Sequence, residues 1–329
     1  PKKGNHTDNA STHELINCSL NSQRSIAYRG IAKYFWEHKD YAVQNKHFID
    51  AAIQDSHPAV QIVAVDMLSP FLHYDLDFAL EKYLELCSYD DRFTIAHNSH
   101  YFVNHAFKST LCDRYVELVK RMSISSIDEV REMAGMQIFD RWYYNDLFQD
   151  TINNALTRDD KFRKGIADVV ILFLIRDLDS IKNEKLLKVF GSLINDPSKS
   201  VRDRLNHTFF NESFWKKEIS KELFGLYINS NHVGENIYYF FHAIENFPDT
   251  LTDFYESILI FIEKITMRNL TIEDKQELYA YSTHLVAFLQ HIYDKAMDDE
   301  DYDILERCMD VWDSLLKSEI PAIQGASRN

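Results

Sequence analysis

Residues 55–71 read DSHPAVQIVAVDMLSPF, a polar turn followed by a stretch in which apolar residues recur at helical spacing. Pro58 stands where the start of a helix tolerates a residue without an N–H. Behind it, one apolar stripe follows at intervals of three and four residues: Val60, Val63, Ala64, Met67, Leu68 and Phe71. This stretch predicts a tight turn and an amphipathic helix, with a helix over 41–54 before it and another over 75–88 after it.

The same arrangement, a polar turn, then Arg or Gln, then small residues on a helix, recurs along the chain. Its copies are NSQR (21–24), DSHPAVQ (55–61), SIDEVR (126–131), DDKFR (159–163) and DPSKSVR (196–202). The spacing between the copies that end at 61 and 131 is about twice the other spacings, and a degenerate copy at 90–93 divides it. A unit therefore has about 36 residues, which is the length of a helix pair with its turns. One such pair cannot bury its own apolar face, so we expect successive pairs to stack.

We therefore predict an all-α protein in three segments: an N-terminal segment (1–19), a repeat array (20–230) and a helical, acidic C-terminal region (231–329). The repeated phrase is lost after residue 210, but helical periodicity continues. It predicts helices over 213–229, 236–245, 249–266, 271–297 and 301–316.

The composition disfavours several other classes. The chain has 8 glycines and 6 prolines in 329 residues, where average usage would give roughly 23 and 16. So few turn-forming residues disfavour a β-sandwich or barrel. Neither GxGxxG nor GxxxxGK[ST] occurs, so the sequence predicts no phosphate loop and no cofactor. The longest apolar run, VVILFLI at 169–175, is too short for a membrane span of about 20 residues.

The charge distribution bears on the partner. The 36 Lys and Arg against 51 Asp and Glu give a net charge of −15, which disfavours a general nucleic-acid binder. Residues 249–329 hold 17 acidic and 7 basic residues, whereas residues 158–221 hold 14 basic and 10 acidic ones. We expect the basic stretch to attract an acidic surface of a protein partner, through Lys161, Lys164 and Arg204.

No set of residues predicts catalysis or metal binding. His97, His100 and His105 lack a convergent carboxylate, and the acidic loop at 298–303 lacks the glycine of a calcium loop. We expect that loop instead to favour the start of the next helix, where Asp301 and Asp303 complement the helix dipole. The four cysteines have no metal-ligand spacing and indicate reduced thiols in a cytoplasmic protein.

Adjacent aromatic residues occur at 143–144, 209–210, 214–215 and 238–241. Neighbours on a helix point about 100° apart, so we expect one member of each pair to pack inward and the other to be available for binding.

The turn phrases resemble the HEAT repeat, most clearly at 55–61 and 196–202, and the resemblance extends over roughly residues 20–210. It implies a right-handed α-solenoid with a helical C-terminal extension, in which the turn Asp and the following Arg bond between neighbouring repeats. The residues that would form this ladder are Asp55, Gln61, Arg131, Arg163, Asp196 and Arg202.

Three longer phrases, LNSQRSIAYRGIAKYFWEH, DSHPAVQIVAVDMLSPFLHYDLDFALEKYLELC and DPSKSVRDRLNHTFF, look like the helical-repeat region of large bacterial ATP-binding proteins of the STAND, NACHT-like class. Several members of that class act in antiviral defence. The resemblance implies a non-catalytic sensor or scaffold region with a protein partner, and ATP would bind to a domain that is not in this chain.

Two alternatives stay open. HEAT-like DNA glycosylases of the alkylation-repair type use this architecture to cradle DNA, but they are strongly basic, whereas this chain is acidic. The other is a stand-alone adaptor or effector without nucleotide chemistry.

Overall fold

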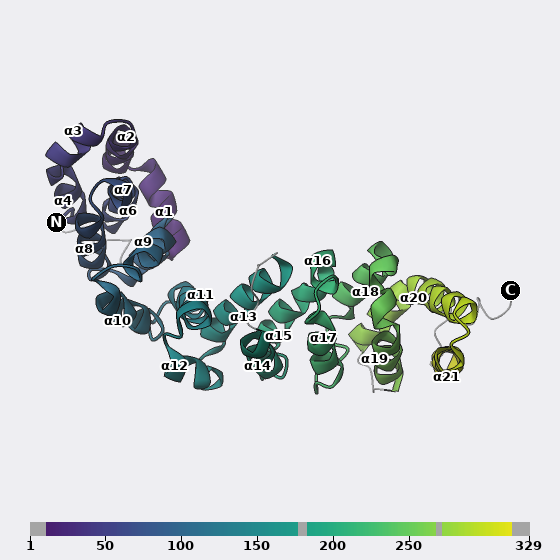
Figure 1. Cartoon of the computed structure of the whole chain (residues 1–329). Helices are drawn as coiled ribbons and strands as arrows, with labels where there is room; N and C mark the ends of the chain where they lie inside the picture. Colours follow the sequence, from purple (N-terminus) through teal and green to yellow (C-terminus); the bar gives the residue numbers. More distant parts are fainter. Residues whose placement is uncertain (1–10, 177–182, 268–271, 318–329) are drawn as a thin grey trace. The chain divides into compact units, whose positions relative to one another are not determined.

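The computed structural model describes residues 11–176, 183–267 and 272–317 (Figure 1). These residues form helices joined by short turns, with no strand among them, which confirms the prediction of an all-α protein. None of the described helices combines the length and the apolar character that crossing a bilayer requires. The chain divides into two compact units, Pro1–Gln137 and Ile138–Asn329, which we call the N-terminal and C-terminal units.

The N-terminal unit is built from short helices. In chain order they are α1 (Thr12–Asn21), α2 (Gln23–Glu37), α3 (Lys39–Gln44), α4 (His47–Ile53), α5 (Pro58–Gln61), α6 (Ala64–Leu68), α7 (Phe71–Tyr74), α8 (Leu76–Cys87), the 3-10 helix η1 (Asp91–Ile95), α9 (Ser99–Ala106) and α10 (Cys112–Met122). Helix α11 (Asp128–Asn145) spans the junction of the two units.

Aromatic residues join consecutive helices of the N-terminal unit. Helix α2 packs against α6, and α6 packs against α4 and α8. The buried ring of Tyr83 on α8 stacks on Phe102 of α9 and lies parallel to Tyr115 of α10, with ring centroids 4.5 and 6.1 Å apart. The Tyr115 hydroxyl donates to the Leu80 carbonyl at 3.0 Å. These contacts hold α8, α9 and α10 around one core.

The two helices predicted on either side of the turn at residue 58 are broken. The expected helix over 41–54 is divided into α3 and α4, and the helix that follows the turn is divided into α5, α6 and α7. The N–H groups of Val63 and Val65 bond three residues back rather than four, in a run rich in β-branched residues that have low helix propensity. Pro70, which lacks an N–H, precedes α7. The apolar stripe is nevertheless fully buried.

The C-terminal unit has longer helices towards its end. They are α12 (Gln149–Asn153), η2 (Ala155–Thr157), α13 (Asp160–Ile175), α14 (Asn183–Leu193), α15 (Lys199–Asn206), η3 (His207–Phe210), α16 (Glu212–Trp215), α17 (Ser220–Ile228), α18 (Ile237–Asn246), η4 (Pro248–Phe254), α19 (Tyr255–Met267), α20 (Ile272–Asp298) and α21 (Tyr302–Lys317). The helices predicted over 271–297 and 301–316 match α20 and α21 to within one residue, whereas the one predicted over 213–229 is divided into α16 and α17.

Helices of the C-terminal unit form two rows (Figure 1). One row consists of α13, α15, η3, α18 and α20, each packed on the next. We call it the second-helix row, because its helices follow the turns. The other row runs from α14 to α17, α19 and α21. Rings of Trp215, Phe224, Phe240, Phe254 and Phe261 fill the space within this unit.

The compact units meet within α11, whereas the sequence predicts a boundary between array and extension near residue 230. Packing continues across residue 230, because Phe224 of α17 stacks on Phe240 of α18 at 5.6 Å and Tyr227 lies 5.8 Å from Phe261 of α19. Hydrophobic contacts of this kind do not depend on the repeated turn phrase, so its loss after residue 210 leaves the packing intact.

Candidate functional site

Two buried arginines link successive turns of the C-terminal unit. Arg163, at the start of α13, donates to both carboxylate oxygens of Asp196, with Nε–Oδ2 at 2.7 Å and Nη2–Oδ1 at 3.0 Å. Arg202, at the start of α15, donates in the same way to Glu235 at 2.8 and 3.0 Å. The side chains of Arg163 and Asp196 are 7% and 0% exposed. Each arginine therefore binds the turn 33 residues further along the chain.

In the N-terminal unit Asp55 repeats this pattern, whereas Gln61 and Arg131 bond within their own helix pair or turn. Asp55 accepts from Arg24 at 2.6 Å, 31 residues earlier in the chain. Gln61 donates its side-chain amide at 2.9 Å to a carbonyl of α4, within its own helix pair. Arg131 donates to the carbonyl of Ser125 at 2.6 Å, also within its own turn.

Glu235 is the titratable member of the second arginine pair. Its burial opposes ionisation, but hydrogen bonds from Arg202 and from the His232 ring outweigh that effect and lower the pKa of Glu235 below its ordinary value. The carboxylate form is therefore the one that the folded state favours.

Two of the three predicted partner-binding cations lie on α13, and the third, Arg204, lies on α15. Lys161 and Lys164 are half-buried on α13, one turn apart, and each interacts with other described groups. Asp168, one turn further along α13, pairs with Arg204 of α15. The sequence predicts Arg204 as a free cation for a partner, but the structure gives it a carboxylate within the protein, so its positive charge is largely offset.

Five rings form an exposed cluster on the second-helix row, which we call the ring cluster: His207 and Phe210 of η3 with Tyr238, Tyr239 and His242 of α18. Phe210 stacks on His242 with ring centroids 3.7 Å apart and planes 22° apart. The Tyr239 hydroxyl lies 2.6 Å from His207 Nε2. Phe210 and Tyr238 remain 39% and 41% exposed.

The two histidines of the ring cluster differ in their polar contacts. Burial of the His207 ring, together with the positive charge of Arg204 beside it, lowers the pKa of His207. His242 Nδ1 is buried and has no hydrogen-bond partner in the described part of the chain. An unpaired buried nitrogen carries a desolvation cost in the free chain, so a reorientation of the His242 ring that lets a bound group pair with this atom would be favourable.

The aromatic pairs that the sequence singles out follow the expected division at three of four places. Tyr144, Phe210 and Tyr238 are the exposed members beside buried Tyr143, Phe209 and the pair Phe240–Phe241. Phe214 and Trp215 are both buried, contrary to expectation. Helix α16 is only one turn long and is enclosed by η3, α13 and η4, so neither of its rings faces water.

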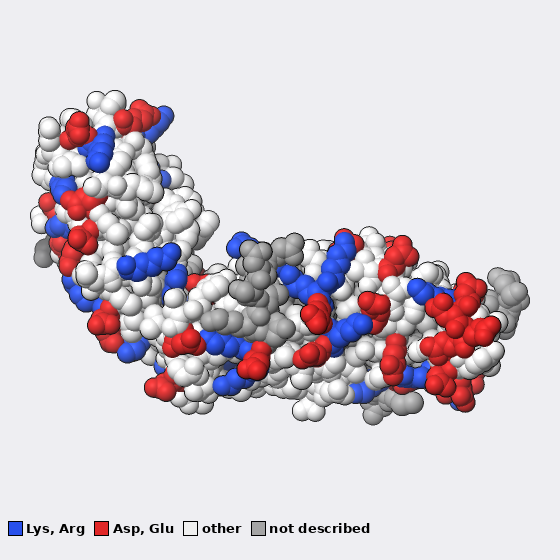
Figure 2. All heavy atoms as spheres, viewed as in Figure 1, with Lys and Arg blue, Asp and Glu red and all other residues white. Residues whose placement is uncertain are grey.

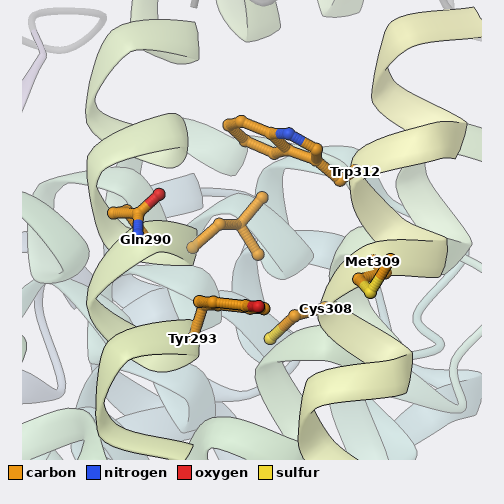
Figure 3. Close-up of a pocket in the computed structure, with 6 residues that line it drawn as sticks. Gln290, Tyr293, Cys308, Met309 and Trp312 are labelled. Carbon is orange, nitrogen blue, oxygen red and sulfur yellow. The ribbon is translucent and has the colours of Figure 1, made fainter. Parts of the chain in front are cut away.

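A second surface feature is a groove of about 240 Å³ between α20 and α21, lined by Leu289, Gln290, Tyr293, Cys308, Met309 and Trp312. Figure 3 shows Tyr293 of α20 and Trp312 of α21 extending into the space between the two helices. Burial raises the pKa of the Cys308 thiol to about 11, so this side chain stays neutral. The groove is therefore mainly apolar, with one amide in its lining.

The histidine and acidic motifs that the sequence singles out both lie in the described part of the chain. Within the described ranges, no group of three or more His, Cys, Asp or Glu side chains is placed to hold a metal ion. Asp301 accepts a hydrogen bond from the N–H of Ile304 at 3.2 Å, in the first turn of α21. This confirms that the acidic loop supports the start of the next helix.

Comparison with protein-family models, with curated proteins and with solved structures finds no match for this chain.

Proposed function

We propose that this chain is a non-catalytic protein-recognition or scaffold module, and that its partner binds to the second-helix row of the C-terminal unit at the ring cluster. The observation that carries the proposal is a set of five rings in mutual contact at the surface, with Phe210 and Tyr238 well exposed. Aromatic side chains of this kind are enriched at the centres of protein interfaces because they bury a large area at little entropic cost.

Polar groups at the ring cluster give it a means of discrimination. The His207–Tyr239 pair offers polar atoms beside apolar ring faces. His242 Nδ1 is already desolvated in the unbound chain, so a partner that reorients this ring and pairs with the nitrogen would recover part of that cost, which is about 1–3 kcal/mol. The Arg204–Asp168 pair lies nearby on the same row, so the aromatic contacts rather than free charge would supply most of the affinity.

The same proposal includes an α-solenoid of HEAT-like pairs. Its support is the two-row packing of the C-terminal unit and the two arginine pairs, each of which joins turns 33 residues apart. Stacked pairs of this kind present one continuous helical face to a partner.

A displayed random-peptide library provides the test, because it needs no prior partner. We expect clones selected on the wild-type chain to bind the double variant Phe210→Ser/Tyr238→Ser at least about tenfold more weakly, since central aromatic anchors dominate interface energetics. The matched control is Tyr89→Ser/Leu156→Ser, two exposed apolar residues that lie outside the cluster. Clones that bind the wild type and the ring-cluster variant equally would contradict the proposal.

The electrostatic part of the proposal has its own variant. Charge reversal at Lys161 and Lys164 should weaken binding of acidic clones and make it less sensitive to salt. Arg204 is left unchanged there, because reversing it would place two carboxylates beside each other.

The link to STAND-type defence proteins stays a prediction from the sequence phrases. Its test is the full-length gene: a fused NTPase core would support a sensor region, and its absence would favour a stand-alone adaptor.

A further inference from the structure

The groove between α20 and α21 continues as an exposed apolar stripe along both helices. On α20 the stripe includes Met297, one turn beyond Tyr293, and on α21 it includes Met309, beside Trp312. These two methionines are 52% and 62% exposed. Methionine is flexible and polarisable, so it adapts to varied apolar partners and is frequent at binding surfaces for helices.

Carboxylates follow the apolar stripe on its outer sides. Asp294 and Asp298 of α20 and Glu306 and Asp313 of α21 are all exposed. Asp294 is four residues from Gln290, and Asp313 is four residues from Met309, so each lies beside a lining residue on its own helix. Figure 2 shows Asp and Glu gathered over the part of the C-terminal unit that contains α20 and α21.

We propose that the α20–α21 groove binds a basic amphipathic helix of a partner protein. The partner helix places a large apolar side chain between Tyr293 and Trp312, against Met309, and sets its Lys and Arg residues against the carboxylates on either side. Amphipathic helices bind apolar grooves in this way through anchors spaced three, four and seven residues apart. The groove lies on different residues from the ring cluster, so this proposal does not depend on the proposed function.

The carboxylates beside the groove favour a basic helix over the other possible partners. A second copy of the chain would bring the same carboxylates to the same place, and like charges brought together at an interface are unfavourable. An acidic helix or a nucleic acid would be repelled for the same reason. A basic helix gains attraction over the whole length of the groove and a faster encounter at low salt.

The probe is a synthetic 18-residue amphipathic peptide with leucines and one phenylalanine on its apolar face and lysines elsewhere, compared with the same peptide carrying glutamate for lysine. We expect the lysine peptide to bind the full chain and the glutamate peptide not to bind, as measured by calorimetry. The double variant Met297→Asp/Met309→Asp should bind the lysine peptide at least about tenfold more weakly, because it loses the apolar contact area of the groove.

The matched control is Tyr89→Asp/Tyr101→Asp, which adds the same two charges on exposed residues of the N-terminal unit. Non-specific attraction of lysines would increase in both variants, so a loss confined to the groove variant identifies the groove. Circular dichroism of both variants establishes that they fold. Equal affinity of the groove variant and the control would overturn the proposal.

The carboxylates have a separate variant. Glu306→Gln/Asp313→Asn should weaken binding of the lysine peptide and reduce its dependence on salt. The control is Glu218→Gln/Glu222→Gln, which removes the same charge from the start of α17 and the turn before it. This control should leave both the affinity for the lysine peptide and its salt dependence unchanged. If the two charge variants behave alike, the carboxylates beside the groove have no specific role and the proposal is wrong.

A photo-crosslinking residue placed at Met309 of the full chain identifies the occupant. Crosslinks to the lysine peptide that are lost when unlabelled peptide is added would support the proposal. Crosslinks to residues 318–329 of the same chain, or to a second copy, that persist at saturating peptide would show a different occupant and overturn it.

Discussion

At the scale of single residues, Arg163 and Asp196 form a buried ion pair that joins two turns of the C-terminal unit. Asp196 is fully buried, and its two carboxylate oxygens accept from Arg163. A buried pair contributes little net stability over an apolar replacement, but removing one partner leaves an uncompensated buried charge. The pair therefore acts mainly to specify which turn meets which.

We expect Arg163→Ala to lower the free energy of unfolding of the C-terminal unit by about 3–5 kcal/mol. Urea denaturation monitored by circular dichroism measures it. The double variant Arg163→Met/Asp196→Leu should recover much of the loss, because no buried charge is left unpaired. Lys216→Ala, which breaks the exposed pair with Glu212, is the control and should change little. If Arg163→Ala is as stable as Lys216→Ala, the role assigned to the Arg163–Asp196 pair is wrong.

Glu235 makes a pH-dependent prediction. Its pKa lies below the ordinary 4.5 in the folded state, so its ionised form contributes stability above that pH, and the contribution is lost as the pH falls through the lower, folded-state value. Glu235→Gln should therefore destabilise the protein by about 1–2 kcal/mol near neutral pH. The difference from wild type should shrink as the pH approaches 3, measured by urea denaturation across this range. A difference that grows on acidification would refute the assignment.

At the scale of elements, helix starts are well determined by local chemistry, whereas helix continuity is not. Asp75 accepts from the N–H of Phe78 at the start of α8 and also pairs with Lys46 at 2.5 Å. The hydrogen bond from Lys46 is the main cause that lowers the pKa of Asp75. One side chain thus caps α8 and joins it to the chain just before α4.

Replacing Asp75 separates these two roles. Asp75→Ala should destabilise the N-terminal unit by about 0.5–2 kcal/mol through the lost cap. Asp75→Asn keeps a good capping residue and loses only the charge, so it should retain most of the stability. Thermal unfolding followed by circular dichroism compares the two. If Asp75→Asn and Asp75→Ala lower the stability equally, the ion pair with Lys46 rather than the helix cap is the stabilising contact.

At the scale of the whole molecule, the proposed function predicts binding without nucleotide chemistry. The sequence has no glycine-rich loop with a lysine that could hold a triphosphate. We expect the purified chain neither to bind nor to hydrolyse ATP, as measured by calorimetry and phosphate release beside a P-loop ATPase as positive control. Turnover above background that persists through successive purification steps would refute the non-catalytic proposal.

Much of the fold was predictable because the relevant signals act over one or two helical turns. The stripe from Val60 to Phe71 identified a buried face, and Pro58 is the first residue of α5. Asp301 was recognisable as a helix-start residue from its place before an apolar run. Breaks such as that at Val63 were missed, because a hydrophobic stripe has the same period whether the backbone bonds four or three residues back.

By itself, the sequence determined the all-α class, the turns that carry the repeated phrase and, at three of the four aromatic pairs, that one ring would face outward. Only the tertiary structure decided that Phe210 and Tyr238 lie together, that Arg204 is paired with Asp168, and that α20 and α21 leave an apolar groove. The physical reason is the separation along the sequence of the residues that interact. Caps, turns and helical faces depend on neighbours within a few residues, whereas the His207–Tyr239 contact joins residues 32 positions apart. Such contacts exist only after the helices have packed, because packing selects which of the many possible neighbours each side chain meets.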